Sequence, residues 1–129
     1  LMPYVDVLVK AGIRVSVFIE PDIGQLDGAK ALGAPVVELH VGAYCDSTGA
    51  DQEREFARIV AAAAHAEKIG LECHAGHGLT FDTVAPVAAI QTIAELNIGH
   101  FLIGEAIFIG LEDSIHSMRR LMDEARASA

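Results

Sequence analysis

The sequence has no tryptophan, only two cysteines and no long apolar run. Cys45 and Cys73 are too few for a disulfide framework and form no C-x-x-C pair, which argues against thiol redox chemistry. The nearest approach to a membrane span, residues 59–64, is far shorter than the ~20 apolar residues required. Because the first residues lack a basic region and a cleavage site, we expect no signal peptide and a cytoplasmic protein.

Basic residues are also scarce: nine Lys and Arg stand against 18 Asp and Glu, a formal net charge of −9 at pH 7. Nucleic acids and anionic membrane surfaces require basic patches, so we expect neither as a partner. The same charge repels an anionic substrate at long range. A phosphate group therefore needs local donors, such as backbone N–H groups, a helix N-terminus or a histidine.

The chain does have a repeated pattern, in which a helix-like segment ends at a glycine and a short apolar run follows. Gly12, Gly33 and Gly70 take this place, and Asn97 takes it in a fourth unit. Gly and Asn both tolerate the left-handed conformation that closes a helix. Repeated helix–strand units in 129 residues, 52% of them hydrophobic, predict a parallel α/β domain.

This pattern defines the expected elements. The expected strands are Arg14–Glu20, Pro35–Val41, Leu71–Ala75 and Ile98–Ile103. The expected helices are Met2–Lys10, Asp22–Leu32, Asp51–Ile69, Val84–Glu95 and Glu112–Ala127. Four β/α units are about half of a (β/α)8 barrel, which takes ~250 residues.

Residue alternation along the strands favours a barrel over an open sheet. In the second strand Val37 and Leu39 share one face, while Glu38 and His40 share the other. An open doubly wound sheet is apolar on both faces, whereas a barrel can hold polar residues on its inner face. We therefore expect an α/β (β/α)8 TIM barrel, with residues 1–129 as about half of its single domain.

The segment Cys73–Thr80 contains the first candidate site residue. His77 stands between Gly76 and Gly78 on the loop that follows the third strand. Parallel α/β folds place their active sites at such loops. Glycines let the backbone approach a ligand and expose N–H groups to phosphate oxygens. The alternative is a histidine that only supports the loop.

Gly99 and His100 form the second candidate group. Together with Gly104-Glu105-Ala106, where we expect a short helix to begin, they resemble the phosphate site that many barrels build after their last two strands. The alternative is that Gly99 only permits tight packing, and the residues by themselves leave both interpretations open.

Glu38 is the third candidate because a carboxylate inside a buried strand is unfavourable unless it is paired or used. Its structural alternative is a pair with a histidine or an amide. His40 lies on the same face two residues later. The roles of His40 and His74 stay open.

Four blocks of the sequence resemble the pyridoxine 5'-phosphate synthase family. They occur in the family's order and at about its spacing, and the resemblance covers essentially all 129 residues: Val15–Asp22, Val37–Gly42, Ala75–Thr80 and Glu95–His100. The family is a (β/α)8 barrel that forms octamers and needs no metal or organic cofactor, and the resemblance implies that residues 1–129 are the C-terminal half of that single domain. The resemblance thus implies a homo-oligomer acting on phosphorylated small molecules.

The resemblance also implies a reaction and residue roles. The family condenses 1-deoxy-D-xylulose 5-phosphate with 3-amino-2-oxopropyl phosphate, releasing pyridoxine 5'-phosphate, phosphate and water. Matched position by position, His77 is the proton donor and Glu38 stabilises a transition state. Gly78, Gly99 and His100 bind substrate or product, including its phosphate. The family's general bases lie in the other half of the barrel, so we expect these 129 residues alone to be inactive.

Two other functions remain as alternatives. A metal-dependent isomerase or endonuclease-like barrel could use Glu38, His40, His74 and His77 as ligands. A non-catalytic half-barrel could instead pair its open sheet edges with a second chain as an assembly subunit.

Overall fold

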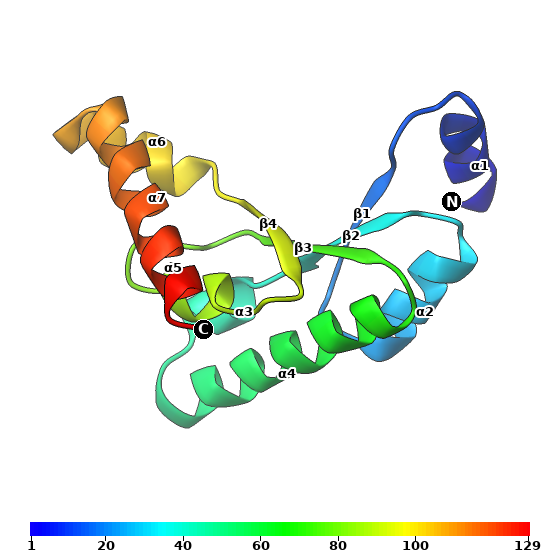
Figure 1. Cartoon of the computed structure of the whole chain (residues 1–129), viewed down its shortest axis with the longest axis horizontal. Coiled ribbons are helices and arrows are strands. Elements are labelled where there is room, and N and C mark those ends of the chain that lie inside the picture. The colour runs from blue at the N-terminus through cyan, green and yellow to red at the C-terminus, as the bar shows by residue number, and fades with distance from the viewer.

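A computed structural model describes all 129 residues, in which one or two helices separate successive strands. The strands are β1 (Ser16–Ile19), β2 (Val36–His40), β3 (Glu72–Gly76) and β4 (Ile93–Asn97), and they form one parallel sheet in the order β1-β2-β3-β4 (Figure 1). This order is the one that four consecutive β/α units of a (β/α)8 barrel produce. The expected fold class is confirmed.

Seven helices accompany the strands. They are α1 (Met2–Lys10), α2 (Ile23–Ala31), α3 (Gly42–Asp46), α4 (Gly49–Lys68), α5 (Val84–Ala88), α6 (His100–Ile109) and α7 (Leu111–Ala127). None of them combines the length and the apolar character needed to cross a bilayer.

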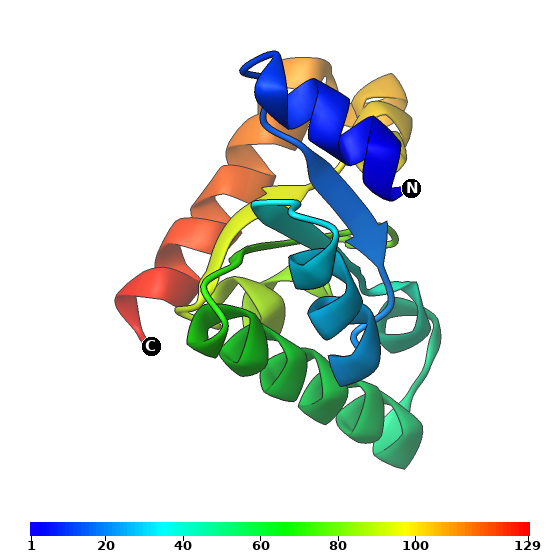
Figure 2. The ribbon, with the colours of Figure 1, turned by 90° about the vertical axis from the view of Figure 1, so that its right-hand side faces the viewer.

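The helices cover the sheet unequally. In Figure 1, α2 and α4 run along one side of the sheet, and the opposite side lies open between α1 and the α6–α7 pair. Figure 2 shows β1 at the near edge, with α1 on one side of it and α2 and α4 on the other. The two faces of the sheet therefore have different surroundings.

The hydrophobic core lies between the sheet and its helical layer. From α4 the core takes Ile59, Ala62, Ala63 and Ala66, which recur at three- and four-residue spacing and are at most 1% exposed. Alanines at these positions let the helix lie close to the strands, because nothing longer than a methyl group separates them. The helix therefore buries one continuous stripe of small and branched side chains against the sheet.

Identifiable contacts fix the start of α2 and the end of α4, the two helices that cover the sheet. Asp22 caps α2, since its carboxylate accepts a hydrogen bond from the backbone N–H of Gln25 at 3.0 Å. Gly70 follows α4 with a φ of +72°, the left-handed conformation expected of a residue that ends a helix. The Lys30 ammonium donates to the Gly70 carbonyl at 3.2 Å and ties the two helices together.

The fourth β/α unit differs from expectation. The predicted strand Ile98–Ile103 is wrong, because β4 ends at Asn97 and α6 begins at His100. The predicted helix Val84–Glu95 is too long, because α5 ends at Ala88. Ala94, Glu95 and Leu96 favour helices in isolation, but pairing with β3 outweighs that weak preference.

These corrections extend to smaller features. Asn97 is the last residue of β4 and closes no helix. Gly104-Glu105-Ala106 lies inside α6 and not at its start. The mostly apolar segment 101–109, interrupted by Gly104 and Glu105, fits a helix as well as a strand, and periodicity cannot separate the two over so short a length.

A β-bulge sets the orientation of β4. Cys73 pairs with Ile93 and His74 pairs with Glu95, so Ala94 is an extra residue on β4. One extra residue reverses the alternation of side chains beyond it. Glu95 and Asn97 consequently lie on the open face of the sheet.

Candidate active site

Four aromatic rings from successive β/α units form a row near the carboxyl ends of the strands. Phe18 on β1 is followed by His40 on β2, with 5.2 Å between ring centroids. His40 stacks on His77 at 4.5 Å and an interplanar angle of 27°. His100, the first residue of α6, lies 6.3 Å beyond His77. The structure thus brings together side chains that are far apart in the sequence.

Gly42 makes the stacking of the two central rings possible. A Cβ at this position would lie 2.7 Å from His40 Cε1 and 3.1 Å from His77 Cδ2. Any side chain there would push the rings apart. His40 Nδ1 is buried without a hydrogen-bond partner, and the nearest carboxylate oxygen, Glu20 Oε1, is 3.6 Å away.

Glu38 lies on β2, half-buried and on the same open face of the strand as His40. Its Oε2 accepts a hydrogen bond of 2.9 Å from Asn97 Nδ2 at the end of β4. Sequence reasoning missed Asn97 as a site residue because it assigned Asn97 to a helix end. The available signal was the general one that a polar residue at the carboxyl end of a parallel strand belongs to the site.

The loop after β3 holds His77 in an unusual backbone conformation. His77 has a φ of +73° and is the only non-glycine residue with a positive φ; Gly78 follows with +85°. Such a conformation is unfavourable for a residue with a Cβ and is found where a surrounding structure enforces it. A Cβ on Gly78 would approach Cys45 Cβ to 3.1 Å, so the loop packs tightly against α3.

Gly99 and His100 lie at the N-terminus of α6. Gly99 precedes the helix without a side-chain cap, and the first backbone N–H groups of a helix have no partner within it. A small recess opens here between the loop after β3 and the start of α6; its lining includes His77, Gly78, Asn97, Gly99 and His100. This recess could accept an anion through backbone N–H groups.

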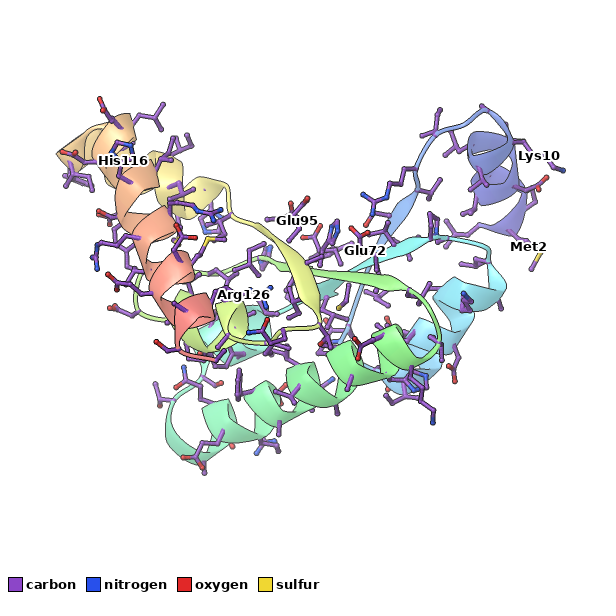
Figure 3. All side chains as sticks on the ribbon, viewed as in Figure 1. Met2, Lys10, Glu72, Glu95, His116 and Arg126 are labelled. Carbon is purple, nitrogen blue, oxygen red and sulfur yellow. The ribbon has the colours of Figure 1, made fainter.

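His74 belongs to a separate polar network on the same face. The residue is 6% exposed. Nε2 lies 2.7 Å from Glu72 Oε1, and Nδ1 lies 3.5 Å from Glu95 Oε1. Glu72 also pairs with Arg14. The hydrogen bond to His74 and then that to Arg14 lower the pKa of the Glu72 carboxyl. Figure 3 shows Glu72 and Glu95 on the side of the sheet away from α4.

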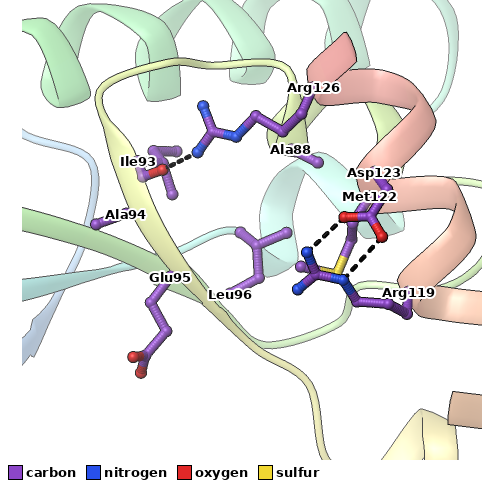
Figure 4. A pocket seen from close by; sticks show the side chains of 9 residues that line it. All are labelled: Ala88, Ile93, Ala94, Glu95, Leu96, Arg119, Met122, Asp123 and Arg126. Carbon is purple, nitrogen blue, oxygen red and sulfur yellow. Dashed lines mark hydrogen bonds and ion pairs between the residues drawn. The ribbon is translucent and has the colours of Figure 1, made fainter.

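A further cavity, of about 140 Å³, lies between β4 and α7 (Figure 4). Its charged groups are already engaged: Arg119 pairs with Asp123, and Arg126 donates to the carbonyls of Ile90 and Ile93. These contacts fasten α7 to the start of β4. The cavity holds none of the candidate residues.

The alternative ligand set for a metal does not come together. No group of three or more His, Cys, Asp or Glu side chains is arranged to hold a metal ion. His74 is occupied by two carboxylates, and His40 and His77 stack face to face. The predicted site residues His77, Gly78, Gly99 and His100 do share one region, with Glu38 linked to it through Asn97.

Fold and site together define a parallel α/β protein of the barrel type, with polar residues collected at the carboxyl ends of its strands. The chain matches the family model described as "Pyridoxal phosphate biosynthesis protein PdxJ" over residues 1–124. The chain therefore belongs to the PdxJ family, and the resemblance drawn from the four sequence blocks is confirmed.

Curated relatives extend this assignment. The chain is 66% identical over 126 residues to the pyridoxine 5'-phosphate synthase of Rhodospirillum rubrum, covering 97% of this chain and 51% of that protein. For the synthase of Zymomonas mobilis the identity is 61% over 127 residues, covering 98% and 50%. For that of Caulobacter vibrioides it is 59% over 119 residues, covering 89% and 47%. The chain spans about half the length of the curated relatives it matches, and the family is one of enzymes.

Proposed function

We propose that these residues form about half of the barrel of a pyridoxine 5'-phosphate synthase. The reaction proposed for the full-length protein joins 1-deoxy-D-xylulose 5-phosphate to 3-amino-2-oxopropyl phosphate and releases pyridoxine 5'-phosphate, phosphate and water. Family membership over residues 1–124 supports the proposal. So do the names of the relatives, which are synthases of this compound.

The observation that carries the proposal is that His77 and His100 line one recess, and that Asn97, which also lines it, donates a hydrogen bond to Glu38. Imine formation, dehydration and aromatisation all require proton transfers, and a histidine performs these near neutral pH. In the proposal His77 donates a proton. Glu38 stabilises the positive charge that develops on a nitrogen intermediate, because its carboxylate is held in place before the charge appears.

The phosphate-binding part of the proposal uses Gly78, Gly99 and His100. These residues line the recess at the start of α6. Backbone N–H groups there and the positive end of the α6 dipole favour a phosphate despite the net charge of −9. The proposal includes no metal or organic cofactor and places the protein in the cytoplasm. It also includes a homo-octameric assembly, and light scattering of the full-length protein would test that assembly.

Two substitutions in the full-length protein test the catalytic roles. His77→Asn and Glu38→Gln should each lower turnover by about 10²-fold or more, since each removes a proton donor or a charge that acts in the transition state. His116→Asn is a matched control, because His116 is exposed on α7. Turnover near the wild-type value in both His77→Asn and Glu38→Gln would contradict the proposed roles.

A further inference from the structure

The hydrogen bond between Glu38 and Asn97 joins two strands that are not neighbours. Glu38 is on β2 and Asn97 on β4, with β3 between them. The carboxylate reaches across β3 at Gly76. A Cβ on Gly76 would overlap Glu38 Oε1 and would lie 2.9 Å from the Asn97 carbonyl oxygen and 3.1 Å from Asn97 Cβ. Only glycine leaves room at this position for the carboxylate and the amide to meet.

The bulge at Ala94 is the second condition for this contact. In a regular strand, every second side chain points to the same face, so without the bulge Asn97 would point to the same face as Ile93. Ile93 faces the core and is 1% exposed. The bulge reverses the face to which the side chains after Ala94 point. Asn97 then pairs with Gly76 on the open face, where its side chain meets Glu38.

The bond also has a chemical character suited to a charge-stabilising carboxylate. A carboxylate only accepts hydrogen bonds, so the Asn97 amide nitrogen is the donor. The neutral amide holds Oε2 in place and leaves the negative charge of the carboxylate intact. A Lys or Arg at this position would neutralise that charge. No other hydrogen bond from the protein engages this carboxylate. Oε1 therefore keeps its capacity to face a bound intermediate.

We propose that Asn97 is a positioning residue that holds the Glu38 carboxylate in its working orientation, and that Gly76 is required because it leaves the path between them open. This inference rests on the proposed role of Glu38. Asn97 does not touch the reacting atoms in this proposal; it removes the rotational freedom that a Glu side chain on a strand would otherwise have.

The test is a double-mutant cycle in the full-length synthase. Asn97→Leu and Asn97→Ser remove the amide, and each should lower kcat about 10-fold or more while KM changes less than about 3-fold. In a Glu38→Gln background the same substitutions should lower kcat by no more than about 2-fold, because the group they act through is already disabled. Glu95→Gln, on the same strand and face, is the control.

Gly76→Ala tests the second half of the proposal. It should reduce kcat to the level of Asn97→Leu or below, whereas Gly28→Ala should leave it unchanged, since a Cβ on Gly28 meets nothing within 4 Å. Thermal unfolding of each variant shows whether it is folded. If Gly76→Ala is not, the Asn97 cycle decides alone.

The outcomes separate this inference from the proposed function. Normal turnover in Glu38→Gln would overturn both. Impaired turnover in Glu38→Gln with normal kcat in Asn97→Leu and Asn97→Ser would overturn only the positioning role. Equal losses from Asn97→Leu in the wild-type and Glu38→Gln backgrounds would do the same, because they would show that Asn97 acts independently of Glu38.

Discussion

The two faces of the sheet differ although the same strands build both. On β2, Val37 and Leu39 are fully buried against the helical layer, while Glu38 and His40 between and after them lie on the open face with the site residues. Neighbouring positions thus serve different purposes. The covered face stabilises the fold by excluding water, and the open face holds the polar groups that are available for chemistry.

The strongest test of this difference is the replacement of Leu39 by Ala. Leu39 is 0% exposed in the core, so Leu39→Ala should lower the free energy of unfolding by about 2–5 kcal/mol. Glu38→Gln, one residue away, should lower it by less than about 1 kcal/mol. Urea denaturation followed by circular dichroism measures both. Equal losses would show that the two faces contribute alike to stability.

High pH should act on the covered face through Cys73. Burial raises the pKa of this thiol from about 9 to about 12. A raised folded-state pKa means that its contribution to stability is complete below pH about 9 and is lost as pH rises toward about 12. The free energy of unfolding should fall over this window.

Cys73→Ala checks the origin of that alkaline loss. The variant should show a flatter dependence of unfolding free energy on pH above about 9 than the wild type. Cys45→Ala is the comparison: burial also raises the pKa of the Cys45 thiol, but this residue is only half-buried, so its removal should flatten the slope less. An unchanged slope in Cys73→Ala would assign the loss to other groups.

On the open face a substitution can gain stability while it removes function. His77 has a φ of +73°, a conformation that glycine adopts without steric penalty. His77→Gly should therefore leave the free energy of unfolding unchanged or raise it by up to about 1 kcal/mol, while turnover of the full-length protein collapses. A clear loss of stability would mean that stacking on His40 outweighs the backbone strain.

The smallest expected effect concerns Glu72 at the exposed rim of the open face. Its pKa is lowered by the hydrogen bonds from His74 and Arg14. A lowered folded-state pKa contributes stability above the ordinary Glu pKa, and that contribution is lost as pH falls through the folded value. Glu72→Gln should flatten the acid side of the stability curve, below the ordinary Glu pKa of 4.5, more than Glu67→Gln does. Added salt should reduce the difference.

The sequence predicted much of the fold because its first three β/α units are locally consistent. The strands near Val17, Val37 and Cys73 each follow a glycine that closes a helix, and α1 has the bounds that were predicted. The fourth unit was misassigned because its strand contains helix-favouring residues and its helix α6 reads as a strand. Pairing with β3, which no local pattern shows, decided between them.

For the site, position along the chain indicated His77, Glu38 and the Gly99-His100 pair, because polar residues at strand ends meet at one edge of a parallel sheet. Their catalytic and binding roles remain predictions. Asn97 could not be found in this way, since its contact with Glu38 depends on a bulge at Ala94 and on empty space at Gly76.

By itself, the sequence determined the α/β class, the family and the residue types available for chemistry, since these follow from periodicity and local motifs. Tertiary structure alone decided where β4 lies, which way Asn97 points and how His40 and His77 stack. The reason is physical: strand register, a one-residue bulge and the absence of a Cβ act between segments distant in the chain, and no local pattern encodes such a contact.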